Sequence, residues 1–252
     1  MKVRVALNYQ GVPYSQSYVS YPDIRPILES LGHASQKSDH SDQTLPAIYH
    51  PESLQDKVPG GQVMIESMDI AFHLDELHPE RPLFPATPSS TREKTIELVQ
   101  HVATLYQKTF GAGRAMKIAI PKVPTYLDDR GAEYFLRTRT ASHPQKKSPL
   151  EWPSKDPEED WSAYEKTLGP IAELLARDAS GPFFMGETFS FADAIAVAHM
   201  IWFERGDEAY LKRISRVHGG VFGKLYDRVK AEGWIDGQGE EREWPVPPKS
   251  AL

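Results

Sequence analysis

In the first 80 residues, the spacing of apolar residues switches between the period of a helix and that of a strand over short stretches. An apolar stripe of helical period covers residues 1–10 and ends at Gly11, and glycine is a typical helix stop. Ile70, Leu74 and Leu77 recur at helical spacing, and several short β-prone runs precede them. The predicted order is helix, strand, helix, strand, strand, helix, over residues 1–10, 14–20, 24–31, 47–49, 62–65 and 67–77. This order indicates a small mixed α/β unit.

The character of the chain changes after a proline-rich stretch. Four prolines fall within residues 78–90, which indicates a connection between domains. Long helical periods follow, and Ser190 with Asp193 has the spacing of a capping box that starts a buried helix and takes no part in chemistry. Helical segments are predicted over residues 96–110, 130–139, 161–175, 190–203 and 207–230, with a surface tail after residue 234. We therefore expect an α/β domain over residues 1–80, a linker over 81–90 and an all-α domain over 91–252.

The composition excludes several classes of function. The formal net charge is −6 and there is no basic block, which argues against nucleic-acid binding because that relies on clustered Lys and Arg. The chain has no cysteine and its nine histidines lack metal-binding spacing, so we expect no disulfide, no cysteine nucleophile and no metal. The most apolar run, residues 189–203, is too short to span a membrane and contains Asp193. The expected location is the cytosol.

A candidate binding site combines Leu45-Pro46 with Glu66-Ser67. Proline at the start of a strand cannot donate to the ladder, so it belongs at an edge or in a cis bend that turns the backbone of Leu45 outward. Ser67 has the character of an N-cap, and the helix that follows it offers free N–H groups to an anion. With the Glu66 carboxylate, this set suits a small peptide that carries an α-carboxylate and an α-ammonium, such as glutathione. Gln43 is a candidate for the second carboxylate of that peptide, and a solvated loop residue explains it equally well.

These residues and this order of elements resemble cytosolic glutathione S-transferases over nearly the whole chain. Residues 183–193 resemble the signature of the family's helical domain. The resemblance implies a thioredoxin-like N-terminal domain, a helical-bundle C-terminal domain, a homodimer and glutathione as substrate or cofactor. Under this resemblance, Leu45-Pro46 corresponds to the cis proline of the family's thioredoxin-like domain. Glu66-Ser67 corresponds to the site that binds the γ-glutamyl residue of glutathione. Three segments resemble more narrowly the fungal etherase-related (Fua-type) transferases, which are similar to bacterial lignin β-etherases: residues 4–11, 21–24 and 130–135.

The start of the chain departs from the family pattern. Family members begin with a strand and a loop that carries the thiol-activating residue, and in the etherase-like branch this loop ends in a Trp-Lys-Thr-Arg-like run. Residues 1–4 correspond to that run, so we expect an N-terminal domain without the first strand and the catalytic loop. The strands over 14–20 and 47–49 would then lack a row of backbone partners. We expect Lys2 and Arg4 to replace part of the lost thiol activation.

The acceptor side of the site and the reaction are open at this stage. The resemblance implies a pocket wall of Tyr106, Phe110, Arg114 and Trp202, and ordinary core packing explains the aromatic residues equally well. We favour a glutathione transferase-like enzyme that uses the glutathione thiolate on a hydrophobic electrophile, by conjugation, ether cleavage or isomerisation, as in fungal secondary metabolism. The alternatives are a protein that binds glutathione or a hydrophobic ligand without turnover, and a glutathione-independent pathway enzyme on the same scaffold.

Overall fold

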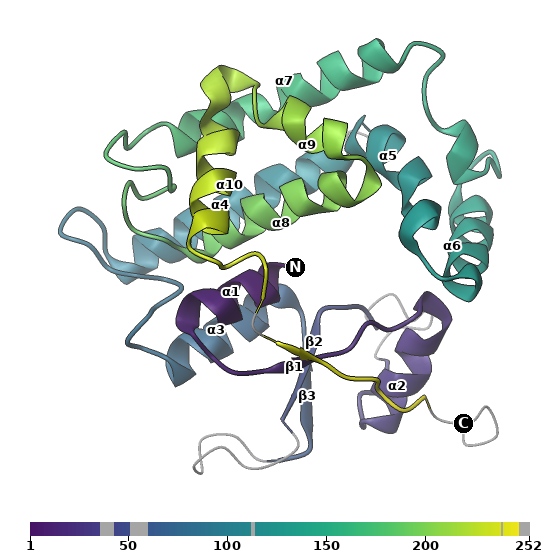
Figure 1. Cartoon of the computed structure of the whole chain (residues 1–252), viewed down its shortest axis with the longest axis horizontal. Helices are drawn as coiled ribbons and strands as arrows, with labels where there is room; N and C mark the ends of the chain where they lie inside the picture. The colour runs from purple at the N-terminus through teal and green to yellow at the C-terminus, as the bar shows by residue number, and fades with distance from the viewer. Residues whose placement is uncertain (36–42, 51–59, 112–113, 238, 247–252) are drawn as a thin grey trace.

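The chain forms a small α/β unit and a larger helical unit stacked on it (Figure 1). The computed structural model describes residues 1–35, 43–50, 60–111, 114–237 and 239–246. The α/β unit contains α1 (Lys2–Gln10), β1 (Ser15–Gln16), the 3-10 turn η1 (Tyr21–Asp23), α2 (Ile24–Ser30), β2 (Ala47–His50), β3 (Gln62–Ile65) and α3 (Ser67–Leu77). The predicted helix over 1–10, the hairpin and the helix over 67–77 are confirmed, and Gly11 ends α1 in the left-handed conformation, at φ 70°.

The helical unit is built around α8 (Phe191–Gly206), which is buried along most of its length. Helix α8 packs against α4, α9 and α10 within the unit and against α1 of the α/β unit, so one core is continuous across both. None of the described helices is long and apolar enough to cross a membrane. The remaining elements are α4 (Arg92–Gly111), α5 (Arg114–Ala119), η2 (Ile120–Tyr126), α6 (Asp129–Ser142), η3 (Pro149–Glu151), α7 (Pro157–Leu175), α9 (Glu208–Ile214), η4 (His218–Gly220), α10 (Val221–Ala231) and β4 (Glu240–Glu241).

The prediction of a strand over residues 14–20 is too long, because only Ser15–Gln16 forms a ladder. Its partner is β4, in parallel register, whereas β2 pairs antiparallel with β3. Among the described residues, no ladder joins these two pairs. Strand β1 is therefore hydrogen-bonded to a segment more than 220 residues away in sequence. A local sequence pattern cannot predict this pairing.

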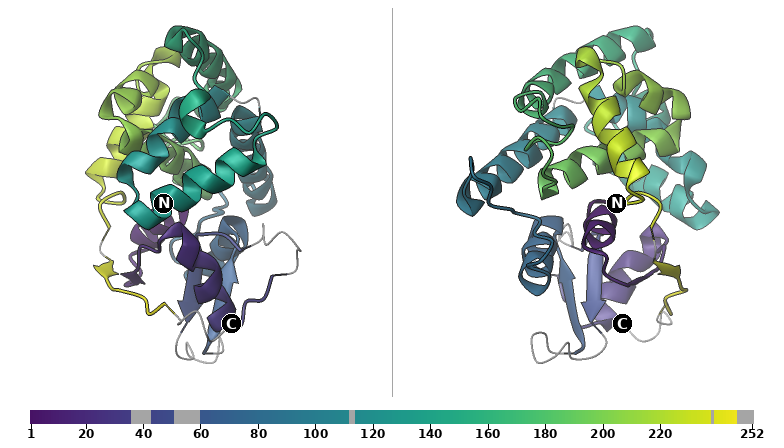
Figure 2. Two further views of the ribbon diagram at one scale, coloured as in Figure 1. Left: turned by 90° about the vertical axis from the view of Figure 1, so that its right-hand side faces the viewer. Right: turned by 60° about the vertical axis from the view of Figure 1, so that its left-hand side comes forward.

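The C-terminal tail runs down from α10 along the α/β unit, as the two further views show (Figure 2). Asn8 Nδ2 donates to the carbonyl oxygen of Trp234 at 2.9 Å, and Arg4 Nη2 donates to that of Ile235 at 2.9 Å. Beyond β4 the ring of Trp244 meets that of Tyr49 edge to face, with centroids 5.4 Å apart. The tail therefore connects α10, α1, β1 and β2.

Candidate functional site

The register of the hairpin brings the two predicted binding segments together. Ala47 pairs with Ile65, so the residues just before β2 lie opposite those just after β3. The Leu45–Pro46 bond is cis, and the Leu45 side chain is 44% exposed. The exposed Glu66 has φ 68° and ψ 110°, a conformation that a non-glycine residue adopts only where its surroundings impose it. The structure thus places the outward-facing Leu45 beside the start of α3.

The N-terminus of α3 differs in one detail from the prediction. Glu66 is the N-cap and Ser67 is the first helical residue, and no side chain among the described residues caps the helix. Ser67 is half-buried, and it lies at the end of α3 where the first backbone N–H groups have no intrahelical partner. This end combines N–H donors, a hydroxyl group and the Glu66 carboxylate, which is a set that fits an amino acid with both charged groups.

Gln43 is buried, which differs from the solvated loop residue considered above. Its Nε2 donates to the carbonyl oxygen of His33 at 3.2 Å, and its Oε1 has no hydrogen-bond partner among the described residues. A buried, unpaired amide oxygen is costly unless a donor reaches it. Gln43 therefore has an acceptor available two residues before Leu45.

Lys2 and Arg4, predicted to act together, make different interactions in the structure. Burial lowers the pKa of Lys2, and the Glu66 carboxylate opposes this shift, so the ammonium group lies within electrostatic reach of the candidate site. Arg4 is instead used by other contacts: its Nη1 donates to the Tyr18 hydroxyl at 3.0 Å and its Nη2 to Ile235 in the tail. Lys2 is therefore the member of this pair with an electrostatic interaction with Glu66.

The predicted aromatic wall surrounds a histidine that the sequence analysis did not single out. The ring centroid of His199 on α8 lies 4.7 Å from that of Tyr106, 5.3 Å from that of Phe110 and 6.2 Å from that of Trp202. Tyr106 is buried, while Phe110 and Trp202 are half-buried and contact each other. Arg114 begins α5, and its side chain lies outside the described residues.

His199 is held neutral inside this cluster. Burial lowers the pKa of His199 to about 3, with a further cationic contribution from Lys2. Its Nε2 is hydrogen-bonded to the hydroxyl group of Tyr164 at 2.6 Å, and burial raises the pKa of Tyr164 well above the usual value. Lys2 is thus within electrostatic reach of both the Glu66 carboxylate and this aromatic cluster. The signal in the sequence was a lone histidine in the apolar part of the predicted helix, after Asp193.

Two of the short segments that carried the etherase-like resemblance contact each other across the two units. Arg130 donates through Nη1 and Nη2 to the two carboxylate oxygens of Asp23, at 3.1 and 2.7 Å. The ring of Tyr21 packs against that of Phe135, with centroids 5.5 Å apart. A methyl group at Gly131 would lie 2.9 Å from the Asp128 carboxylate that caps α6, so a larger residue there would displace the cap. These contacts connect η1 with α6.

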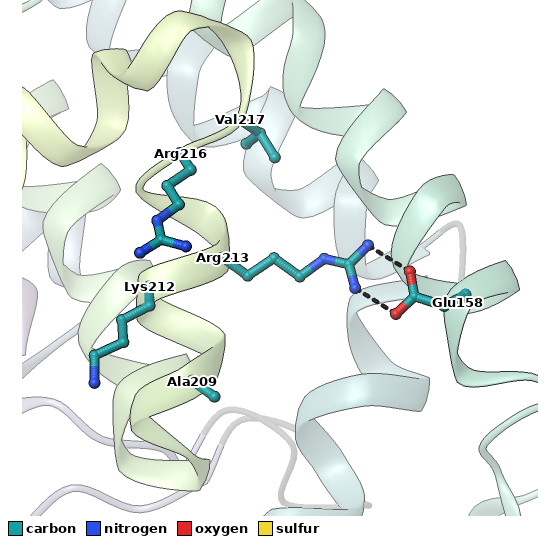
Figure 3. A pocket seen from close by; sticks show the side chains of 6 residues that line it. All are labelled: Glu158, Ala209, Lys212, Arg213, Arg216 and Val217. Carbon is teal, nitrogen blue, oxygen red and sulfur yellow. Dashed lines mark hydrogen bonds and ion pairs between the residues drawn. The ribbon is translucent and has the colours of Figure 1, made fainter.

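A surface hollow elsewhere is separate from this site. It has a volume of about 550 Å³ and is lined by residues of α7 and α9 and the turn that follows (Figure 3). Arg213 crosses it to the carboxylate of Glu158, at 2.9 Å through Nη2. Because this ion pair already neutralises Arg213, and none of the lining residues belongs to the predicted set, we assign the hollow no part in binding.

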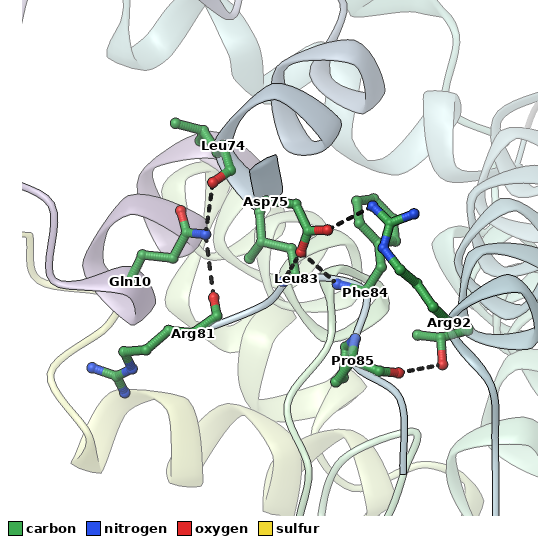
Figure 4. A network of polar contacts seen from close by, with 9 residues as sticks. Gln10, Leu74, Asp75, Arg81, Leu83, Phe84, Pro85 and Arg92 are labelled. Carbon is green, nitrogen blue, oxygen red and sulfur yellow. Dashed lines mark hydrogen bonds and ion pairs between the residues drawn. The ribbon is translucent and has the colours of Figure 1, made fainter. Parts of the chain in front are cut away.

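A polar network holds the segment between the two units in place (Figure 4). The Asp75 carboxylate accepts from the backbone N–H of Leu83 at 2.6 Å, from that of Phe84 at 3.1 Å and from Arg92 at 2.7 Å. Gln10 Nε2 donates to two carbonyl oxygens, of Leu74 and Arg81. The network fixes α1 and α3 relative to α4, and so fixes Lys2 relative to the start of α3.

A thioredoxin-like unit with few strands, followed by a helical bundle, is the fold of the glutathione S-transferases. The comparisons agree over both units: residues 1–82 match the model of the glutathione S-transferase N-terminal domain, and residues 98–231 match that of the C-terminal domain. The chain belongs to the glutathione S-transferase family.

Several proteins that the chain is similar to come from fungi. A glutathione S-transferase-like protein of Aspergillus flavus, ustS, is 36% identical, with 100% of this chain and 89% of that protein covered. A glutathione S-transferase of Ceriporiopsis subvermispora, solved in complex with glutathione, is 26% identical with a TM-score of 0.76, covering 92% of this chain and 89% of its own. The transferase GSTFuA3 of Phanerochaete chrysosporium is 26% identical with a TM-score of 0.73, and the match covers 92% of this chain and 88% of that one.

Proposed function

We propose that this protein binds glutathione at Leu45, Pro46, Glu66 and Ser67 and uses its thiolate on a hydrophobic electrophile. The observation that carries the proposal is the Ala47–Ile65 register, which sets an exposed strand edge beside a helix N-terminus and a carboxylate. In this arrangement the helix N-terminus and the Ser67 hydroxyl group hold the α-carboxylate of the γ-glutamyl residue. Glu66 holds its α-ammonium group, and the backbone of Leu45 pairs with the cysteinyl residue. The free Oε1 of Gln43 accepts from the amide N–H of the glycyl residue.

The acceptor molecule is placed against Phe110 and Trp202, the half-buried members of the aromatic cluster around His199. Their rings offer a flat apolar surface within the helical unit, which favours an aromatic or otherwise planar electrophile. The reaction is conjugation, ether cleavage or isomerisation. The etherase-related resemblance supports a role in fungal secondary metabolism, with a cytosolic homodimer as the working form.

Replacement of Ser67 by alanine is expected to weaken glutathione binding by about 10- to 100-fold, because a hydrogen bond to a charged carboxylate contributes roughly 1.5–3 kcal/mol. Titration calorimetry with reduced glutathione measures the change. Ser142→Ala, which removes an exposed hydroxyl group at the end of α6, is the matched control and should bind as the parent does. If the parent protein gives no heat with glutathione, the site is not a glutathione site. Binding without turnover of any electrophile would favour the alternative of a binding protein.

Lys2→Ala is expected to lower kcat/KM for a chlorodinitrobenzene-type acceptor by about 10-fold or more, while the affinity for glutathione changes little. The reason is that a cation near the sulfur lowers the pKa of the thiol, and a shift of one pKa unit corresponds to about 1.4 kcal/mol. The apparent pKa in the pH–rate profile should rise toward about 8.5, the value of a free thiol. Arg4→Ala serves as the comparison, since Arg4 is bonded to Tyr18 and the tail. Equal rates for Lys2→Ala and the parent would rule out this role.

A further inference from the structure

Two imidazole rings lie head to head on the α/β unit, at residues that the proposed function does not use. His50 is the last residue of β2, and His73 lies on the second turn of α3. Their Nε2 atoms are 3.1 Å apart, and the ring planes meet at 65° with centroids 5.2 Å apart. Both side chains are half-buried, so water and small ions can reach them.

Burial favours the neutral form of both rings, and a neutral imidazole carries a nitrogen lone pair. Burial lowers the pKa of His50, and His73 adds to that effect. Burial also lowers the pKa of His73, with Glu76 opposing the shift and His78 supporting it. Neutral imidazole nitrogen is the form that binds metal ions. In the metal-free pair one ring donates its Nε2–H to the other, and a change of that ring to its Nδ1–H tautomer frees both lone pairs without loss of a proton.

The spacing of the two nitrogens suits one shared metal ion. With metal–nitrogen distances of about 2.05 Å, two nitrogens 3.1 Å apart subtend an angle of about 98° at the metal, between the octahedral and tetrahedral values. The ring centroids would then be about 4.8 Å apart, against about 5.4 Å for a straight hydrogen bond. The observed 5.2 Å lies between these values, so a small rotation of the rings reaches the metal-binding arrangement.

We propose that His50 and His73 form a two-histidine site for a divalent transition metal of the copper, nickel and zinc group. Imidazole is the ligand that these ions share, and copper binds most tightly in the usual order of stability. Among the described residues no cluster of three His, Cys, Asp or Glu side chains is placed to hold a metal. The site therefore supplies two ligands, and water completes the coordination. Because His50 is on β2 and His73 on α3, the ion links the hairpin to the helix that starts at Ser67.

The test is a titration of the full chain, produced without a histidine tag, with copper(II), followed by calorimetry and electron paramagnetic resonance. We expect one equivalent to bind with a spectrum split by two imidazole nitrogens. His50→Gln and His73→Gln keep hydrogen-bonding groups at these positions but remove the ligand, so each should weaken binding at least 10-fold and lose the two-nitrogen pattern. His101→Gln, at an exposed histidine on α4, is the matched control and should bind copper as the parent does.

Urea unfolding of the metal-free variants separates ligand loss from damage to the fold. Variants that remain folded and bind copper as tightly as the parent would overturn the proposal. It would also be overturned by a parent protein that binds no copper, in which case the two rings form a hydrogen bond and nothing more. Neither result decides whether the protein binds glutathione, because neither His50 nor His73 is among the residues proposed to hold it.

Discussion

Asp193→Ala is expected to lower the free energy of unfolding by about 3–5 kcal/mol, because it leaves several buried donors without an acceptor. The carboxylate of this fully buried residue accepts from the backbone N–H of Ser190 at 2.8 Å, from the Ser190 hydroxyl group at 3.0 Å and from the backbone N–H of Phe184 at 2.9 Å. It thus joins the start of α8 to the segment before it. A loss of this size is a large share of the roughly 5–15 kcal/mol that stabilises a typical domain.

Urea unfolding followed by circular dichroism measures this change. The free energy of unfolding of Asp193→Asn should lie between that of the parent and that of the alanine variant. Its carbonyl oxygen can still accept from the backbone N–H of Phe184, but its amide group cannot accept from the N–H of Ser190. Asp129→Ala is the control: it removes an exposed acid from the first turn of α6 and should change stability by less than about 0.5 kcal/mol. An alanine variant at 193 that is as stable as this control would show that the cap contributes little.

His199 is expected to make the protein less stable as the pH falls below neutral. Its pKa is about 3 in the folded protein and about 6.5 in an unfolded chain, so between these values the unfolded state binds the extra proton. Stability is therefore lost as the pH falls from about 6.5 toward 3, at up to about 1.4 kcal/mol per pH unit from this group alone. Between pH 7 and pH 5 the expected loss is about 2 kcal/mol.

The His199→Gln variant isolates this contribution, because glutamine offers Tyr164 an acceptor but does not titrate. The variant should be less stable than the parent at pH 7, and its further loss on going to pH 5 should be about 2 kcal/mol smaller than the parent's. His101→Gln, on the exposed face of α4, should leave the pH dependence as it is in the parent. The same loss in the His199 variant and the parent would mean that His199 is not buried in its neutral form.

Much of the architecture could be predicted from local patterns. The apolar period of residues 67–77 and the glycine after residue 10 placed α3 and the end of α1 correctly, because helix limits depend on neighbours in sequence. The hairpin over β2 and β3 followed from two β-prone runs around a turn, and its register is what brings Pro46 and Glu66 together. The strand over 14–20 was predicted too long, since a strand extends only as far as a partner accompanies it.

The sequence by itself indicated the family, the order of the elements in the α/β unit and the residues proposed for the γ-glutamyl site, because these depend on local spacing and short motifs. Only the tertiary structure decided the rest. It gave Lys2 and Arg4 different interactions, placed His199 within the aromatic cluster, joined Asp23 to Arg130 and gave β1 its partner at Glu240. Each of these contacts joins residues far apart along the chain or depends on which side of a helix is buried. The physical reason is that such pairings are selected by the packing of the whole core, which short-range periodicity does not specify.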